Sequence, residues 1–323
     1  MDCFGIHDRN YCRQEEFIME IKKAAIIGVG ALGVLFGRQI AAALGKDAVC
    51  YVADRQRIER YQRDGVYCNG EKLDLCFIDR DDTTANPVDL LIFAVKYPAI
   101  QEAVEAARRL VGEQTVIISL LNGITSERVL SDAFGAEKVL YCVAQGMDAI
   151  KDGSRFSYQN MGELVIGEAD NRRSEKLSAV ARFFDCAGVP YKIPENTMHT
   201  LWNKLMLNVG VNQTTAIYGI NFRELQKEGP ARQTMLSAMR ETKAVAAYEG
   251  ITLTEEDISR WMQVLDSLNP DGRPSMAQDV LARRRTEVEL FAGTITALGK
   301  KHGIPTPTND LLYAKIKEIE RQF

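Results

Sequence analysis

Three polar side chains recur at every fourth position of an otherwise apolar segment. Lys204, Asn208 and Asn212 lie between residues 199 and 217, and most positions around them are apolar. Residues four apart share one face of a helix, so the segment predicts a buried helix with one polar stripe. A buried lysine is costly without a partner, and asparagine is a weak helix former. We interpret the stripe as one wall of a polar cleft; the alternative is a narrow solvated face.

A glycine-rich loop predicts a dinucleotide-binding site. It follows the apolar run 24–28, has the pattern G-x-G-x-x-G, and opens the helix-periodic segment 31–44. In such a loop the glycines allow a tight turn, close approach to a pyrophosphate and close helix–strand packing, and the helix N-terminus favours phosphate. A second apolar run, 48–53, completes the βαβ context that the motif requires. The candidate cofactor contacts are Gly28, Val29, Gly30, Ala31, Leu32 and Gly33.

The residues after the second apolar run leave the choice of nicotinamide cofactor open. An acidic residue about 20 positions beyond the glycines holds the ribose 2′-hydroxyl of NAD, and Asp54 fits that position. Arg55 and Arg57 follow it directly, and an arginine here accommodates the 2′-phosphate of NADP. Asp54 and Arg55 are therefore both candidate cofactor contacts.

Two further apolar runs end in polar residues. Residues 88–95 are followed by Lys96, and residues 115–121 are followed by Asn122. Ligands of open α/β sheets bind beyond the carboxyl ends of the strands. Either side chain alone is compatible with an ordinary loop, but together, beside a glycine loop, they predict a cofactor-lining role.

The order of the elements predicts two domains. A chain of 323 residues exceeds one core of ordinary size. Strand-like and helix-like segments alternate in the first part, and helical segments follow. We expect an α/β Rossmann domain followed by an all-α C-terminal domain. The expected boundaries are a disordered N-terminal extension at residues 1–20, a dinucleotide-binding domain at 21–192, and a helical substrate and catalytic domain at 193–323.

Two patterns bear on local structure. The alternating run 65–77 surrounds Asn69-Gly70 and predicts a β-hairpin with a type I′ turn. A second long helix is expected over residues 275–301. Ser275 and Gln278 have the spacing of a capping box at its start.

Composition excludes several classes of protein. Apolar residues make up 46% and charged residues 26% of the chain, as in ordinary globular proteins. The net charge of −4 argues against a nucleic-acid partner. No apolar run approaches the length of a membrane span, and the polar start lacks the apolar stretch of a signal peptide. We therefore expect a cytoplasmic protein with no membrane partner.

The cysteines and histidines give no sign of a metal site. Seven cysteines are scattered without a C-x-x-C pair, and the three histidines have no companion ligands. This distribution is typical of reduced thiols and argues against zinc.

Taken together, these motifs resemble the ketopantoate reductase (2-dehydropantoate 2-reductase) family. The resemblance covers nearly everything after Met19. Its matching segments are the glycine loop, the strand that ends at Lys96, and residues 121–123, 166–168, 201–216, 285–287 and 303–307. It implies a Rossmann domain, a 6-phosphogluconate-dehydrogenase-like helical domain, and NADPH-dependent reduction of ketopantoate in pantothenate biosynthesis, with NAD as the other possible cofactor.

The resemblance assigns roles residue by residue. Lys204 would polarise the keto oxygen and supply the proton, and Glu287 would hydrogen-bond near that oxygen. Lys96 and Asn122 would line the nicotinamide end of the cleft. The substrate would be held by Asn122, Asn208, Asn212 and Ser275.

Other functions stay open on the sequence alone. One is a related NAD(P)-dependent dehydrogenase of another 2-keto or 2-hydroxy acid, and another is a nicotinamide-binding sensor without activity. The expected partner is a small 2-keto acid, and a homodimer is one of the assemblies that the sequence leaves open.

Overall fold

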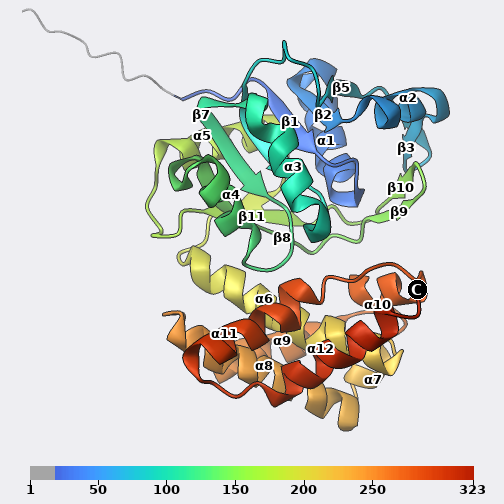
Figure 1. Ribbon diagram of the computed structural model, residues 1–323, viewed down its shortest axis with the longest axis vertical. Coiled ribbons are helices and arrows are strands. Elements are labelled where there is room, and N and C mark those ends of the chain that lie inside the picture. Colours follow the sequence, from blue (N-terminus) through green and yellow to red (C-terminus); the bar gives the residue numbers. More distant parts are fainter. Residues whose placement is uncertain (1–18) are drawn as a thin grey trace, which may run out of the picture.

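Strands alternate with helices in the first part of the chain. The computed structural model describes residues 19–323, so the extension predicted at residues 1–20 lies outside the described residues except for Met19 and Glu20. An α/β lobe is followed by a helical lobe (Figure 1). The predicted boundary after residue 192 falls between the last strand of the first lobe and the first helix of the second.

The main sheet has the strand order β12-β11-β8-β7-β6-β1-β2-β5. Its strands are β1 (Ala24–Ile27), β2 (Val49–Ala53), β5 (Cys76–Asp79), β6 (Val88–Phe93), β7 (Val111–Ser119), β8 (Val139–Gln145), β11 (Glu163–Gly167) and β12 (Tyr191–Lys192). From β8 to β5 all neighbours are parallel, and β11 runs antiparallel to β8. The sheet confirms the predicted Rossmann architecture.

Helices cover both faces of this sheet. They are α1 (Ala31–Leu44), α2 (Arg55–Asp64), α3 (Ile100–Ala107), α4 (Ser126–Phe134) and α5 (Glu175–Ala187). In β1, Ala24 and Ile26 contribute to the core under α1 and α5, while Ala25 and Ile27 contribute to the core under α3 and α4. Successive strand residues point to opposite faces, so burial on both faces explains the uninterrupted apolar run.

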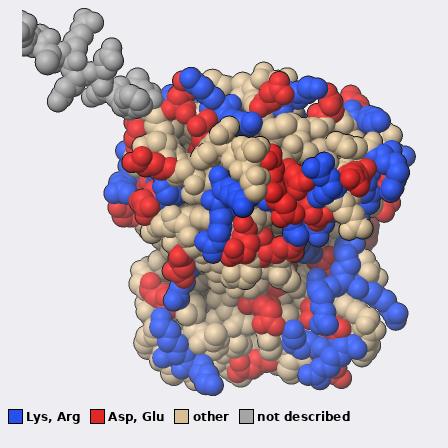
Figure 2. Space-filling model, turned by 45° about the horizontal axis from the view of Figure 1, so that its top comes forward, with Lys and Arg blue, Asp and Glu red and all other residues tan. Residues whose placement is uncertain are grey.

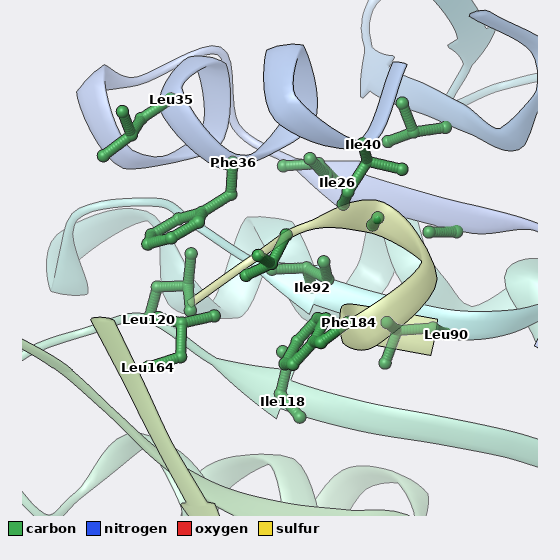
Figure 3. Packing of buried hydrophobic residues seen from close by; sticks show 14 of the residues in the cluster. Ile26, Leu35, Phe36, Ile40, Leu90, Ile92, Ile118, Leu120, Leu164 and Phe184 are labelled. Atoms are coloured by element: carbon green, nitrogen blue, oxygen red, sulfur yellow. The ribbon is translucent and has the colours of Figure 1, made fainter. Parts of the chain in front are cut away.

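The core on the α1 and α5 face is built from large aliphatic and aromatic side chains. Phe36 and Ile40 of α1 lie over the central strands, and Phe184 of α5 lies beside them (Figure 3). All three are at most 1% exposed. This packing fixes α1, and with it the glycine loop, against the carboxyl end of β1.

A second, smaller sheet lies beside α2 (Figure 1). It has the order β4-β3-β10-β9 and consists of β3 (Val66–Cys68), β4 (Glu71–Leu73), β9 (Ile150–Asp152) and β10 (Arg155–Ser157). Asn69 and Gly70 have φ values of 50° and 84°, which confirms the predicted type I′ hairpin between β3 and β4. The β9–β10 hairpin is absent from the sequence prediction because its strands are too short to show alternation.

One expectation about the cysteines is wrong. Cys50 and Cys76 form a disulfide with a Cα–Cα distance of 4.5 Å, whereas the scattered spacing predicts reduced thiols. The parallel register of β2 and β5 places the two residues directly opposite each other. Spacing along the chain does not reveal this register. Of the other described cysteines, Cys68 and Cys142 are buried and Cys186 is exposed.

The second lobe is helical, as predicted. Its helices are α6 (Thr197–Tyr218), α7 (Phe222–Leu225), α8 (Pro230–Tyr248), α9 (Glu255–Ser267), α10 (Ser275–Leu281), α11 (Thr294–His302) and α12 (Pro307–Glu320). Among the described residues, no strand follows Lys192. Helix α6 packs against α8, α10 and α12 of its own lobe and also contacts β8 and β11. It therefore spans the junction of the lobes (Figure 1).

The single helix predicted over residues 275–301 is wrong. Helix α10 ends at Leu281, Arg283 adopts a positive φ of 52°, and a π-helical turn at Glu289–Gly293 precedes α11. A positive φ at a residue other than glycine breaks a right-handed helix. The helical periodicity of the sequence does not reveal this local reversal.

The described helices and the surface add two facts. Within residues 19–323, no helix is both long and apolar enough to cross a membrane. Basic and acidic side chains are interspersed over the face in Figure 2. On this face, recognition of a charged ligand would therefore depend on local clusters of charge.

Candidate active site

Helix α6 brings the polar stripe to the junction of the lobes. The helix begins after Asn196, whose side chain accepts a hydrogen bond from the His199 backbone N–H, and it ends at Gly219 with a φ of 66°. This confirms the helix predicted over residues 199–217. Asn208 and Asn212 are each 7% exposed, so the stripe is enclosed by protein rather than solvated.

Lys204 reaches out of α6 to groups of the α/β lobe. Its ammonium group donates hydrogen bonds to the Ala144 carbonyl oxygen of β8 and, at 3.2 Å, to Oδ1 of Asn122. Burial lowers the pKa of Lys204 to about 8, against the opposing effects of Glu287 and Cys142. Both acceptors are neutral, so the charged form gains little compensation for its desolvation. A lysine with this pKa exchanges a proton readily near neutral pH.

Asn122 connects Lys204 with Glu287. It follows β7, and its amide nitrogen donates to Oε2 of Glu287 at 2.9 Å. The next residue, Gly123, has a φ of 92°, and a Cβ atom there would lie 3.3 Å from Leu290. The turn at Gly123 therefore lets the loop approach the helical lobe closely, and Asn122 bridges an ammonium group and a carboxylate.

Glu287 sits where the helix predicted by the sequence is interrupted. The interruption is held by Glu320 of α12, whose Oε1 accepts from the backbone N–H and the hydroxyl of Thr286 at 2.8 and 2.7 Å. Burial raises the pKa of Glu320, but the two Thr286 hydrogen bonds and the nearby Lys317 outweigh it and lower that pKa. The ionised carboxylate thus fixes the residue next to Glu287.

A small pocket opens at Lys204. The residues that line it are Leu121, Asn122, Gly123, Cys142, Val143, Leu201, Lys204 and Leu205. Apart from Lys204 and Asn122, the side chains that line the pocket are apolar or weakly polar. An apolar wall with a few convergent polar groups is typical of a small-molecule site.

The glycine loop has the close contacts that a dinucleotide site requires. Gly28 has a φ of 111°, and a Cβ atom on Gly33 would come within 2.3 Å of the Gly28 carbonyl oxygen. No side chain caps the start of α1 at Gly30, and no acidic residue lies in its first turn. The N–H groups of Gly30, Ala31 and Leu32 are therefore placed for an anionic group.

Lys96 and Ser275 lie at the same junction but have different surroundings. Lys96 donates to Asp279 of α10, and Asp279 also accepts from Arg284 at 2.9 Å. Ser275 is the first residue of α10 and is exposed, and Pro274 precedes it as the N-cap without any side-chain hydrogen bond. The predicted Ser275 capping box is therefore wrong, because proline occupies the capping position.

The candidate ribose contacts at the end of β2 are already engaged. Asp54 caps α2 by accepting from the Arg57 backbone N–H at 2.7 Å, and its other oxygen lies 3.3 Å from Nε of Arg57. Arg55 points to Asp79 of β5, with an Nε–Oδ2 distance of 2.8 Å. Both residues lie where the sequence predicts them, but local partners occupy their charged groups.

Comparison with known protein families accounts for both lobes. Residues 24–171 match the model of "Ketopantoate reductase PanE/ApbA", and residues 196–320 match "Ketopantoate reductase PanE/ApbA C terminal". The chain belongs to the ketopantoate reductase family.

Individual members of this family align over nearly the whole chain. A 2-dehydropantoate 2-reductase of Aquifex aeolicus (strain VF5) is 27% identical over 306 residues, covering 93% of this chain and 97% of the relative. The crystal structure of a PanE/ApbA family ketopantoate reductase from Ralstonia eutropha JMP134 has a TM-score of 0.80 at 27% identity and covers 93% of this chain and 99% of its own. The ternary structure of D-mandelate dehydrogenase with NADH and anilino(oxo)acetate reaches a TM-score of 0.83 at 23% identity, with the same coverage of both chains. This last likeness concerns the fold alone.

Three groups around the ketopantoate reductase site are missing from the sequence prediction. They are the Ala144 carbonyl, Asp279 and Glu320. A backbone carbonyl has no signature in the sequence, and Glu320 lies 34 residues from Thr286. Asp279 stands four residues after Ser275, so the helical spacing from a candidate substrate residue could have indicated it.

Proposed function

We propose that this protein reduces 2-dehydropantoate (ketopantoate) to pantoate with NADPH. Membership of the ketopantoate reductase family and the names of its aligned relatives support the reaction. The observation that carries the proposal is the chain of hydrogen bonds from Lys204 through Asn122 to Glu287. It joins both lobes at the carboxyl end of the parallel sheet, where open α/β sheets bind their ligands.

The α/β lobe fits a nicotinamide dinucleotide. Gly28 and Gly33 permit the close approach of α1 to β1, and the uncapped start of α1 suits a pyrophosphate. From there the cofactor extends towards Lys96 and Asn122 at one end, and towards Asp54 and the α2 arginines at the other. The additional arginines of α2, such as Arg60, favour NADPH over NADH.

The helical lobe offers the groups that a 2-keto acid needs. Asn208 is 7% exposed, and its buried Nδ2 has no hydrogen-bond partner among the described residues. A buried donor without a partner costs free energy, so a substrate carboxylate or hydroxyl oxygen would stabilise this position. Asn212 lies one turn further along the same face, and Ser275 starts the helix that packs against α6.

The chemistry follows from the environment of Lys204. The dihydronicotinamide, when bound, supplies a hydride to the keto carbon. Negative charge then develops on the keto oxygen, where the Lys204 ammonium stabilises it and donates the proton. Two of its three N–H groups are held by Ala144 and Asn122. The third remains for the substrate.

The test is an absorbance assay at 340 nm with purified protein, NADPH and a panel of 2-keto acids. The proposal expects rapid oxidation of NADPH with ketopantoate and slower oxidation with the other acids. Faster oxidation of NADPH with another 2-keto acid would show that the protein catalyses the same type of reduction on a different substrate. Tight cofactor binding with no oxidation by any acid would instead indicate a nicotinamide-binding sensor.

A further inference from the structure

A lysine from outside the glycine loop contacts that loop directly. Lys151 lies on β9, and its Nζ donates to the Val29 carbonyl oxygen at 2.8 Å. The two residues are 122 positions apart in the chain. The contact uses one of three ammonium N–H groups, so the other two remain for a further acceptor.

The β9–β10 hairpin is anchored so that Lys151 stays over the loop. β10 pairs with β3, which follows α2. Tyr158, just beyond β10, accepts a hydrogen bond at 2.9 Å from Arg38 of α1. The ammonium group lies 5.4 Å from the centroid of the Phe156 ring, which is 5% exposed. The hairpin thus contacts α1, the glycine loop and the strand that follows α2.

Two arginines of α2 extend this positive charge. Arg60 lies over the Tyr61 ring at 5.1 Å, and Arg57 pairs with the Asp54 carboxylate. Burial of its ammonium end lowers the pKa of Lys151, and repulsion from Arg60 and Arg57 lowers it further. The residue as a whole is exposed, so this effect concerns the tip that reaches the loop.

The cluster carries more positive than negative charge. Within residues 19–323, neither Lys151 nor Arg60 has a carboxylate within 4.0 Å, and Asp54 is the ion-pair partner of Arg57. Lys151, Arg57 and Arg60 with Asp54 therefore leave a net charge of +2. A phosphate monoester carries a charge of about −2 near neutral pH, so a single such group would neutralise the cluster.

We propose that Lys151, together with Arg60 and Arg57, binds the ribose 2′-phosphate of NADPH. The assignment rests on the proposed function, because it takes the glycine loop as the cofactor site. The adenosine ribose lies at the carboxyl end of the second strand, which is where α2 starts. The pyrophosphate belongs at the start of α1. Arg55, which the sequence offers for the same phosphate, is paired with Asp79 instead.

The test measures equilibrium binding by calorimetry, so that it does not depend on turnover. The ligands are NADPH, NADH and the fragments 2′,5′-ADP and 5′-AMP. The variants are Lys151→Met and Arg60→Gln, and Lys72→Met is the matched control. Lys72 is an exposed lysine of the same small sheet, so its removal changes the charge of the sheet without removing a contact to the glycine loop.

The expected result is selective for the phosphorylated ligands. Lys151→Met should weaken NADPH and 2′,5′-ADP by about tenfold or more, as for loss of a charge-assisted hydrogen bond, and NADH and 5′-AMP by less than about twofold. Arg60→Gln should have the same selectivity, and Lys72→Met should leave every dissociation constant within about twofold.

Two results would overturn the assignment. Equal losses for NADPH and NADH would place Lys151 at the pyrophosphate or in the support of the loop. Unchanged NADPH binding in both variants would remove the cluster from the cofactor site. If the unaltered protein binds neither dinucleotide, the proposed function itself fails, and the calorimetry separates that outcome from the other two.

Discussion

The two ends of the proposed cofactor cleft hold positive charge in different ways. At the helical lobe, Lys204 is enclosed, and neutral oxygens of Ala144 and Asn122 accept its hydrogen bonds. At the far end, the exposed residues Lys151, Arg57 and Arg60 repel one another, and within the described part of the chain only Arg57 of the three pairs with a carboxylate, that of Asp54. Burial makes the charged form of Lys204 costly, so its pKa depends strongly on neighbouring groups. At the exposed end, solvent screens the charges, so several like charges can lie close together.

This difference assigns the reaction to the enclosed end and cofactor recognition to the exposed end. At the enclosed end, the position and protonation of one ammonium group determine the chemistry, so single changes should have large effects on turnover. At the exposed end, recognition depends on the number of charges, so single changes should have small to moderate effects on binding alone. Each variant below tests one side of this division.

The largest effect is expected from Lys204→Ala. The loss of both the charge stabiliser and the proton donor should lower kcat by roughly 10³-fold or more, while the dissociation constant for NADPH stays within about twofold. Steady-state rates and calorimetry measure the two quantities. Lys192→Ala is the control because Lys192 is exposed and outside the cleft. Near-normal turnover of Lys204→Ala would remove this lysine from the mechanism.

Stability should respond to a second enclosed group, Glu127 of α4. Glu127 is 0% exposed, and burial raises its pKa to about 7. Because the folded pKa lies above the unfolded value of 4.5, the folded state is favoured below pH 4.5 and loses stability as the pH rises towards 7. The loss is of the order of 3 kcal/mol.

Urea denaturation at several pH values measures this loss. The Glu127→Gln variant should lack the decline in unfolding free energy between pH 4.5 and 7, and the exposed Glu113→Gln control should retain it. A Glu127→Gln protein with the same pH dependence as the unaltered protein would show that the carboxyl is not the cause.

A smaller effect is expected at Glu320, which acts on Glu287 from a distance. Replacing this carboxylate with an amide in Glu320→Gln weakens its hold on Thr286, so kcat should fall by roughly tenfold through misplacement of Glu287. The KM for NADPH should not change. Glu318→Gln, on the exposed side of the same helix, should be neutral in both. Equal changes in kcat and in cofactor KM would indicate a general structural role.

The smallest effect is expected at the exposed end, for Arg55→Gln. Arg55 pairs with Asp79 and not with the proposed phosphate site. The loss of a surface ion pair lowers the free energy of unfolding by at most about 1 kcal/mol, so the fold around the site should be retained. NADPH binding should therefore change by less than about threefold. A loss of tenfold or more, confined to NADPH, would make Arg55 the main phosphate contact and weaken the case for Lys151.

The sequence predicts those parts of the site that local patterns specify. The glycine loop follows from its position between a strand and a helix, and the Lys204 stripe follows from a four-residue spacing within one helix. Asn122 is predicted because it directly follows the buried apolar run 115–121. In each case, the residues that decide the structure are neighbours in the chain.

The remaining parts depend on contacts between distant residues. The break after α10 is fixed by Glu320, far along the chain from Thr286. Lys151 reaches Val29 only because β10 pairs with β3. The Cys50–Cys76 disulfide depends on the register of β2 and β5. None of these contacts produces a periodic pattern, so propensity and spacing cannot predict them.

The most direct test of the account is the pH dependence of kcat/KM for ketopantoate reduction. Lys204 must be protonated to donate, and its pKa is about 8, so kcat/KM should fall about tenfold per pH unit above that value. Glu287 raises the pKa of Lys204, so Glu287→Gln should move the break to lower pH. A profile that stays flat beyond pH 9, or a break that Glu287→Gln leaves in place, would contradict a mechanism centred on Lys204.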